Sequence, residues 1–284
     1  MKTAISKSNA NLALLKYWGV DDTGKVLLPS LSVPLPDCVT ETKVTLVVDA
    51  TVREVKFDAD PTRIIAFVDQ FLAEFNVKKG YIVETSNNFP VAVGMASSAS
   101  GFSALAKALA ELVGVDVLDD RVKDLLARTS GSALRSLLDG VVEWQPSGHE
   151  LVVRDDLAGF DLEVTSYIVD DCAKEFSSSE LHKMVPSSPL FADRLANFAD
   201  RYERLVTAMR NDDWPGFADV VTEEAWSFLI QAWSCKHKVA LLKPESLRIW
   251  EKVVQMRADG VDICVTFDAG ATVHVLGRKG WVLG

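Results

Sequence analysis

The sequence predicts an α+β fold built from two parts. Strand-like segments dominate the first 50 residues and helical periodicity is concentrated in the second half, so strands and helices do not alternate regularly. The 284 residues, 48% of them hydrophobic and 25% charged, can bury the core of one large domain or two smaller ones. We expect domains at 1–170 and 171–284, because acidic and serine residues within 165–185 are typical of a surface connection.

The first half is predicted to run from strands through two helices back to strands. Val44, Leu46 and Val48 alternate as in a half-buried strand. Apolar side chains recur at helical spacing from Phe102 to Val113, and residues 119–128 form a second short helical stretch. The segment 141–153 then returns to strand around a turn at 146–148, where proline, serine and glycine follow one another.

The second half is predicted to place long helices on a small sheet. Apolar side chains alternate steps of four and three along one helix, at Phe191, Leu195, Phe198, Tyr202, Leu205 and Met209. Residues 214–233 and 244–258 form two further helices, and 162–169, 261–267 and 272–277 form strands. We expect most tryptophans of these helices to be core residues, although they could serve a subunit interface.

Charge and cysteine usage exclude several classes of protein. A formal net charge of -10 argues against nucleic acid and anionic membrane surfaces as partners, but a local basic pocket can still hold a small anion such as ATP. The four cysteines lack C-x-x-C spacing, and no run reaches the roughly 20 apolar residues of a membrane span. No histidines have metal-ligand spacing, which makes a zinc site improbable. We expect a cytoplasmic protein with reduced thiols.

A stretch of small residues at 94–101, GMASSASG, is the first candidate binding site. Small residues let a ligand approach the backbone, and the first turn of the following helix offers unpaired N–H groups and the positive end of its dipole. Ser97 and Ser98 add hydroxyl groups. The stretch matches neither the Walker pattern nor the spaced glycines of a dinucleotide fold, so it favours phosphate without proving it.

Four other segments have both a chemical and an ordinary interpretation. Residues 11–19, NLALLKYWG, could simply end a strand with an aromatic plug. Residues 130–136, SGSALRS, could be a surface loop or an anion shell around Arg135. Asp268 could cap a turn or act as a partly buried base. His182 follows a serine run and is more typical of a surface or lining residue than of a catalyst.

Taken together and in order, these segments resemble the diphosphomevalonate decarboxylases of the GHMP kinase superfamily. The resemblance runs from about residue 5 to residue 277. It is carried by residues 11–19, 28–33 (LPSLSV), 88–90 (NFP), 94–99, 130–136, 143–144 (EW) and 267–270 (FDAG). It implies a two-domain GHMP kinase fold. The N-terminal domain is a β/α domain similar to a domain of a ribosomal protein, and the C-terminal domain is a ferredoxin-like α/β sandwich. It also implies a homodimer.

The resemblance further implies an activity and a set of catalytic residues. The family uses ATP and Mg²⁺ to convert 5-diphosphomevalonate into isopentenyl diphosphate, CO₂, ADP and phosphate. By similarity, Asp268 orients or deprotonates the 3-hydroxyl group, and Lys16 offsets the developing negative charge. Arg135, positioned by Asn11, holds the substrate carboxylate, so that the breaking C–C bond aligns with the leaving C–O bond.

The remaining site residues are also implied by the resemblance. The phosphates of ATP are expected at Gly94, Met95, Ala96, Ser97, Ser98, Ser100 and Gly101, with Mg²⁺ reached through ATP near Ser97. The phosphate end of the substrate is expected at Tyr17, Ser130, Gly131, Ser132, Arg135, Ser178 and His182.

Three departures from the family pattern, one of which is that the chain is shorter than most members, leave alternatives open. The family usually continues Lys-Tyr-Trp-Gly with a lysine, where this chain has Val20, and it usually has Pro-Asn where this chain has Ala271 and Thr272. A lost charge-assisted contact of roughly 1.5–3 kcal/mol could shift preference toward 5-phosphomevalonate. A mevalonate 3-kinase is a second alternative, and a non-catalytic metabolite sensor a third; the retained Lys16 and Asp268 argue against both.

Overall fold

A computed structural model of the chain describes residues 1–23, 25–89, 97–170 and 175–281. It divides into two compact units, which are considered separately. The first comprises Met1–Leu12, Val33–Val91 and Ala96–Val153, and the second comprises Ala13–Ser32, Ala92–Met95 and Arg154–Gly284. The division therefore falls at residue 154, ahead of the expected 170, and residues 13–32 join the second unit because the chain passes from one unit to the other within its two longest strands.

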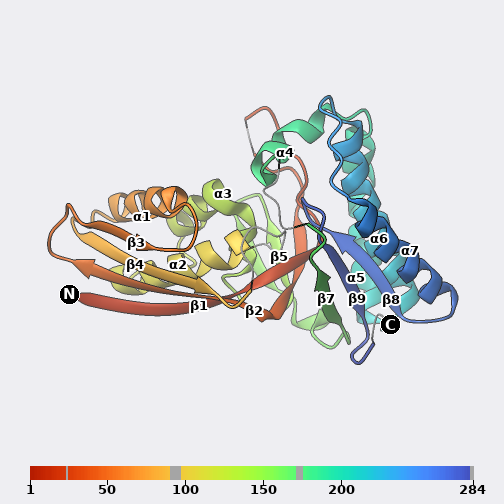
Figure 1. Cartoon of the computed structure of the whole chain (residues 1–284), viewed down its shortest axis with the longest axis horizontal. Helices are drawn as coiled ribbons and strands as arrows, with labels where there is room; N and C mark the ends of the chain where they lie inside the picture. The colour runs from red at the N-terminus through yellow and green to blue at the C-terminus, as the bar shows by residue number, and fades with distance from the viewer. Residues whose placement is uncertain (24, 90–96, 171–174, 282–284) are drawn as a thin grey trace. The chain divides into compact units, whose positions relative to one another are not determined.

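The first unit is built on a six-stranded sheet in the order β3-β4-β2-β5-β6, with β1 also paired to β2 (Figure 1). Its strands are β1 (Lys2–Leu15), β2 (Ser30–Val47), β3 (Arg53–Lys56), β4 (Gly80–Asn87), β5 (Val142–Gln145) and β6 (Glu150–Val153). β2 and β4 are antiparallel, with Thr40 opposite Asn87 and Val47 opposite Gly80. The predicted turn at 146–148 is confirmed, since β5 and β6 form the antiparallel hairpin around it.

Three helices cover this sheet: α1 (Thr62–Glu74), α2 (Ser97–Val113) and α3 (Asp120–Arg135). They pack against one another and against β3, β4 and β5. Phe67, Phe71 and Leu72 of α1 are buried, so the aromatic and aliphatic residues of that helix belong to the core. In α2, alanines and leucines face the interior, with Ala104, Leu105 and Leu109 almost fully buried.

The expectation of a loop at 130–136 is wrong. The structure continues α3 through this segment to Arg135, with one non-helical residue, Ser130, at a kink (φ -159°, ψ 94°). The serines and glycine have weak helix propensity, which favoured a loop, but Ala133 and Leu134 are fully buried and α3 packs along α2. Burial of that apolar face outweighs the local propensity, and Arg135 is buried rather than solvated.

The second unit has a three-stranded sheet in the order β7-β9-β8. Its elements are β7 (Glu163–Tyr167), α4 (Ser178–Met184), α5 (Phe191–Arg210), α6 (Trp214–Ser234), α7 (Pro244–Ala258), β8 (Ile263–Phe267) and β9 (Val273–Gly277), with short 3₁₀ turns at Asp155–Leu157 and Val185–Ser187. All three predicted strands and all three predicted helices are present. Helices α6 and α7 pack on β8 (Figure 1), and Phe228, Val265 and Phe267 are buried there.

The serine run at 177–179 lies on the surface as expected, but it is also a helix start. The Ser177 hydroxyl accepts the Glu180 N–H, and the Glu180 side chain accepts the Ser177 N–H, which is a capping box for α4. Leu181 then anchors the helix in the core. His182 lies in this helix, next to Leu181.

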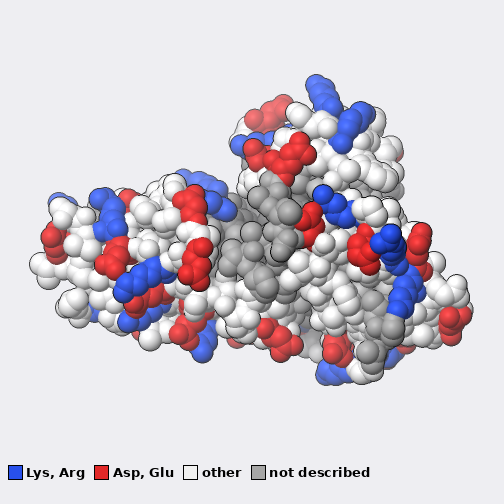
Figure 2. Space-filling model, viewed as in Figure 1, with Lys and Arg blue, Asp and Glu red and all other residues white. Residues whose placement is uncertain are grey.

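The fold class predicted from the sequence is confirmed, with sheets and helices in both units. Within the described ranges, no helix is long and apolar enough to cross a membrane. On the face shown in Figure 2, acidic and basic side chains are interspersed rather than gathered in a field of one sign.

Candidate active site

A buried lysine and a carboxylate meet in the second unit. Lys16 follows the end of β1 and Asp268 follows β8, and the Lys16 Nζ lies 3.2 Å from the Asp268 Oδ1. The Lys16 side chain is 5% exposed and that of Asp268 is 26% exposed, so the carboxylate is the member of the pair that solvent or a substrate can reach. Nζ also donates to the Ala13 carbonyl at 2.9 Å. A cation held against an accessible carboxylate suits proton transfer and charge stabilisation.

The main chain of Lys16 is fixed by a buried ion pair that sequence reasoning missed. Its N–H donates to the Glu224 carboxylate at 3.0 Å, and its carbonyl accepts from the Arg194 guanidinium at 2.9 Å. Arg194 and Glu224 are themselves 2.6 Å apart with fully buried side chains, and Arg201 also bonds Glu224. The available signal was Arg194, a charged residue within the apolar face of a predicted helix. The sequence does not indicate a partner for it.

Tyr17, which follows this lysine in the chain, lies against His182 of α4. Their rings stack with centroids 4.8 Å apart and an interplanar angle of 18°, and the Gly19 N–H donates to the His182 Nδ1 at 3.3 Å. Gly19 has φ 95°, and a Cβ on it would lie 2.4 Å from the Phe191 ring, so only glycine fits this turn. Ser178 is exposed one turn earlier on α4. Val20, where the family pattern has lysine, is half-buried and bridges to Val26.

Asn11 and Arg135 meet in the first unit. The Arg135 Nε donates to the Asn11 Oδ1 at 3.2 Å, and the Asn11 amide donates to the Ser132 carbonyl at 3.0 Å and the Ser136 hydroxyl at 2.7 Å. Asn11 is 5% exposed and Arg135 is 3% exposed. Arg135 lies in the last turn of α3, where the helix dipole favours a cation. The structure thus brings two predicted residues into direct contact from positions 124 residues apart.

Serine hydroxyls from the two small-residue motifs also come together in the first unit. The Ser130 hydroxyl donates to Ser98 at 3.5 Å and shares a hydrogen bond of 3.2 Å with Ser132. Ser97 begins α2 and is half-buried, and Gly131 lies in the kinked part of α3. Gly94, Met95 and Ala96 lie outside the described residues. The polar cluster formed by Ser98, Ser130 and Ser132 is the local environment in which a phosphate could be bound.

Ser100 and Gly101 are placed differently from Ser97 and Ser98. Ser100 is fully buried, and its hydroxyl shares a 2.6 Å hydrogen bond with Thr40 of β2. A Cβ added to Gly101 would meet no described atom within 4 Å, so packing does not require glycine at that position. The first turn of α2 contains no acidic residue, which leaves the positive end of the helix dipole available to an anion. The burial of Ser100 and its bond to Thr40 turn its hydroxyl toward β2, so among the described residues of the motif Ser97, Ser98 and the helix start are the groups left for a phosphate.

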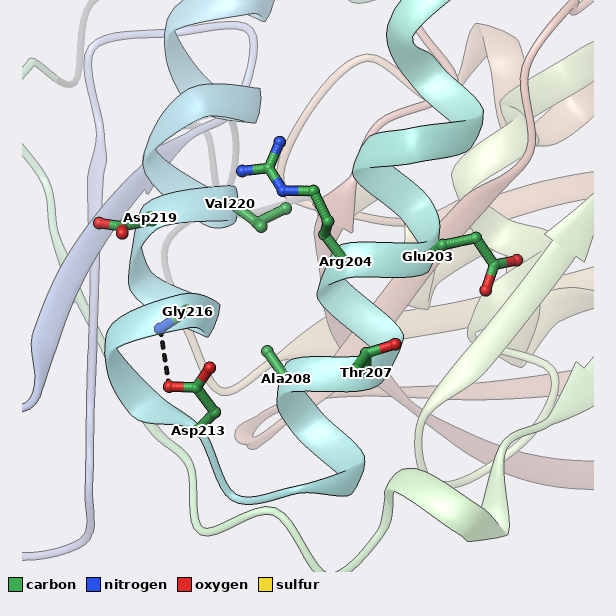
Figure 3. Close-up of a pocket in the computed structure, with 8 residues that line it drawn as sticks. All are labelled: Glu203, Arg204, Thr207, Ala208, Asp213, Gly216, Asp219 and Val220. Carbon is green, nitrogen blue, oxygen red and sulfur yellow. Dashed lines mark hydrogen bonds between the residues drawn. The ribbon is translucent and has the colours of Figure 1, made fainter.

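The hollow between α5 and α6 is a different feature from these groups. It is lined by Glu203, Arg204, Thr207, Ala208, Asp213, Gly216, Asp219 and Val220 (Figure 3). Asp213 caps the start of α6 by accepting the Gly216 N–H at 3.0 Å. None of the predicted site residues lines this hollow. Across the described ranges, no group of three or more histidine, cysteine, aspartate or glutamate side chains is arranged to hold a metal ion.

The fold and these groups define a protein of the GHMP kinase class. Two family models match successive parts of the chain: Diphosphomevalonate decarboxylase-like N-terminal domain over residues 8–155, and Mevalonate 5-diphosphate decarboxylase C-terminal domain over residues 164–280. The chain belongs to the diphosphomevalonate decarboxylase family.

Individual relatives agree with this assignment. Diphosphomevalonate decarboxylase of Candida albicans is 29% identical over 302 residues, which cover 95% of this chain and 83% of that protein. The crystal structure of mevalonate diphosphate decarboxylase from Staphylococcus aureus has a TM-score of 0.88 at 25% identity, covering 98% of this chain and 88% of that one. A structure of MDDEF in complex with MVAPP, AMPPCP and magnesium has a TM-score of 0.86 at 25% identity, covering 98% and 89%.

Proposed function

We propose that this chain catalyses the ATP-dependent decarboxylation of 5-diphosphomevalonate, yielding isopentenyl diphosphate, CO₂, ADP and phosphate. The observation that carries the proposal is the Lys16–Asp268 pair, which retains a buried ammonium against an accessible carboxylate in a chain of this family. A tertiary hydroxyl group is a poor leaving group. Phosphorylation at that oxygen makes the C–O bond breakable, after which loss of CO₂ from the neighbouring carbon forms the double bond.

Asp268 and Lys16 act at the 3-hydroxyl group in this proposal. The Asp268 carboxylate accepts a hydrogen bond or the proton from that hydroxyl as its oxygen becomes phosphorylated. Lys16 lies against the Asp268 Oδ1 at 3.2 Å and stabilises negative charge that develops next to it. The Arg194–Glu224 pair bonds both the N–H and the carbonyl of Lys16. The backbone from which the ammonium group extends is therefore held in place.

Arg135 binds the substrate carboxylate, and Asn11 sets its orientation. A guanidinium offers a planar set of donors that matches a carboxylate, and Asn11 orients it with a neutral amide oxygen that does not neutralise its charge. Holding the carboxylate out of the plane of the forming double bond aligns the C–C bond with the departing oxygen. That alignment is a positioning contribution to the rate.

The serines and the aromatic group bind phosphates. Ser97, Ser98 and the first-turn N–H groups of α2 would hold the phosphates of ATP with their Mg²⁺, which supply the phosphoryl group and neutralise its charge. Tyr17, Ser130, Ser132, Ser178 and His182 would contact the phosphate end of the substrate. The hydrogen bonds among Ser98, Ser130 and Ser132 support this assignment, because hydroxyls that already face one another can rotate toward an oxyanion.

A second candidate substrate is 5-phosphomevalonate, giving isopentenyl phosphate. The observation that favours it is Val20, an apolar residue one position beyond Gly19 where a cation would meet a second phosphate. A missing charge-assisted contact is worth roughly 1.5–3 kcal/mol, about one to two orders of magnitude in relative specificity.

One experiment tests both candidates. Purified protein with ATP and Mg²⁺ is offered mevalonate, its 5-phosphate and its 5-diphosphate in parallel, and CO₂ and ADP are measured. We expect CO₂ release with the diphosphate. Faster release with the monophosphate would move the assignment to the second candidate, ADP without CO₂ would indicate a 3-kinase, and neither product from any substrate would overturn an enzymatic function.

We also propose that the protein works as a cytoplasmic homodimer. The support is the family membership, together with two apolar side chains of α6, Ile230 and Trp233, which are 42% and 53% exposed in the single chain. Of the helix tryptophans expected to be mostly core, Trp214 is fully buried, Trp226 and Trp250 are partly buried against the core, and Trp233 is exposed. Sedimentation at micromolar concentration would reveal a monomer if this proposal is wrong.

A further inference from the structure

A row of polar side chains crosses the sheet of the second unit. Ser166 of β7 lies opposite His274 of β9, and His274 lies opposite Thr266 of β8 in the antiparallel ladders. Residues directly opposite one another in a ladder point to the same face of the sheet. Asp268 directly follows the end of β8, two residues after Thr266. The apolar residues Val265, Phe267 and Val275 alternate with them in a hydrophobic cluster.

His274 connects the interior of this row to the carboxylate. It is fully buried, and its Nδ1 forms a 2.8 Å hydrogen bond with the Ser166 hydroxyl. Its Nε2 lies 3.9 Å from the Asp268 Oδ2, whereas Lys16 contacts the other oxygen, Oδ1. The two oxygens of one carboxylate therefore face two different nitrogen groups. A distance of 3.9 Å is too long for a hydrogen bond, but hydrogen bonds at active sites are often long before substrate binds.

We propose that His274 is a positioning residue that orients the Asp268 carboxylate and keeps it ionised, a role that rests on the proposed function. With the Ser166 hydroxyl as the donor to Nδ1, the ring proton lies on Nε2, and this is the tautomer whose N–H points toward Oδ2. A shift of the carboxylate by less than 1 Å on substrate binding brings this N–H into hydrogen-bonding range. The bond favours the charged form of Asp268 and prevents rotation about its side chain.

The surroundings of the carboxylate set the direction of the pH effect. Among the residues that the structure describes, Lys16 from the segment after β1 and His274 from β9 are ionisable groups that face it. β7 and β8 contribute the neutral hydroxyls of Ser166 and Thr266 to the same face. Loss of the donor on Oδ2 destabilises the anion, which raises the pKa of Asp268. The acidic limb of the pH–kcat profile should then move to higher pH.

Two amide substitutions separate the two nitrogens of His274. The amide nitrogen of His274→Gln approximates the donor Nε2, while the amide oxygen of His274→Asn approximates the acceptor Nδ1 and keeps only the contact with Ser166. We expect His274→Asn to lower kcat by roughly tenfold or more, the effect of one lost hydrogen bond to a charged group, and to shift the acidic limb upward. We expect His274→Gln to retain most of kcat and the wild-type limb. KM for ATP should be unchanged in both.

A variant of Ser166 and a titration of Asp268 without substrate test the role of His274 by other means. If neither amide variant folds, Ser166→Ala leaves His274 in place and should reproduce the shift of the limb, with Ser166→Thr as its control. The Asp268 carboxyl is also titrated by carbon NMR in the unliganded protein, assigned with Asp268→Asn, and its pKa should rise in His274→Asn by less than the shift of the kinetic limb, because before substrate binds only the Nε2–H dipole at 3.9 Å favours the anion. Active wild-type protein with identical profiles and titrations in all variants overturns the role of His274, whereas wild-type protein that releases no CO₂ overturns the proposed function.

Discussion

Two groups of polar residues differ in the contacts that the structure describes for them. In the Lys16 group, which consists of Lys16, Asp268, Arg194 and Glu224, each charge is placed against an opposite charge. In the Asn11 group, which consists of Asn11, Ser132, Arg135 and Ser136, a guanidinium is oriented by a neutral amide that is itself fixed by a carbonyl and a hydroxyl. Both groups begin from the same strand region, five residues apart in the sequence.

Because of this difference, we expect the Lys16 group to affect the stability of the fold, and the Asn11 group to affect mainly substrate binding. Removing one member of a buried ion pair leaves an uncompensated charge, so the Lys16 group contributes to folding as well as to chemistry. An amide oxygen carries no formal charge, so Asn11 orients Arg135 without neutralising it. We therefore expect changes in the Lys16 group to alter turnover or unfolding, and changes in the Asn11 group to alter mainly the use of the mevalonate substrate.

The largest effect on activity is expected from Asp268→Asn. Asparagine keeps the size of the side chain but removes the base, so kcat should fall by roughly 10²- to 10⁴-fold while ATP still binds. The measurement is CO₂ release together with nucleotide affinity. Asp262→Asn is the matched control, because Asp262 pairs with Arg278 at 2.8 Å on the partly exposed side of the same unit. Unchanged kcat in Asp268→Asn would remove this carboxylate from the mechanism.

The largest effect on stability is expected from Glu224→Gln. Glu224 pairs with Arg194 and Arg201 in a fully buried position, so neutralising it should lower the free energy of unfolding by about 3–5 kcal/mol. Glu223→Gln is the control on the same helix, since that side chain is 40% exposed and its ion pairs should be worth less than about 1 kcal/mol. Urea unfolding of both variants measures the difference. Equal losses would show that burial does not set the strength of this network.

The sequence predicted the elements of both units better than it predicted the contacts of either group. The strands ending before Asp268 and beginning at Val273 follow from apolar runs bounded by turn residues, and the long helices follow from their apolar periodicity. Lys16 and Asp268 are 252 residues apart, so no local pattern indicates their contact. Only the resemblance to a family suggested it.

The errors and omissions have physical causes. The end of α3 was predicted as a loop because serine and glycine disfavour helices locally, while burial of Ala133 and Leu134 is a tertiary effect. Glu224 was missed because charged residues in a helical pattern are usually solvated, and its partner lies on another helix. His274 interrupts an apolar strand, which is a signal of a buried polar contact, but the sequence does not indicate the partner of that side chain.

A smaller effect on activity, and little on folding, is expected from Arg135→Lys. Lysine keeps the charge but cannot present two parallel donors to a carboxylate, so kcat/KM for the mevalonate substrate should fall by roughly 10- to 100-fold. KM for ATP should change little. Arg128→Lys on the same helix is the control, because that side chain is 74% exposed. If both lysine variants behave like wild type, Arg135 does not hold the substrate carboxylate.

The smallest expected effect distinguishes two serines in the first turn of α2. Ser100 is fully buried against Thr40, so Ser100→Ala should lower the free energy of unfolding by about 1 kcal/mol and leave KM for ATP unchanged. Ser97 is half-buried at the helix start, so Ser97→Ala should leave stability nearly unchanged and raise KM for ATP several-fold. Each variant is the control for the other, since both remove one hydroxyl from the same turn. A rise in KM for ATP in Ser100→Ala alone would reverse the assignment, and would place the nucleotide on the side of the helix that faces β2.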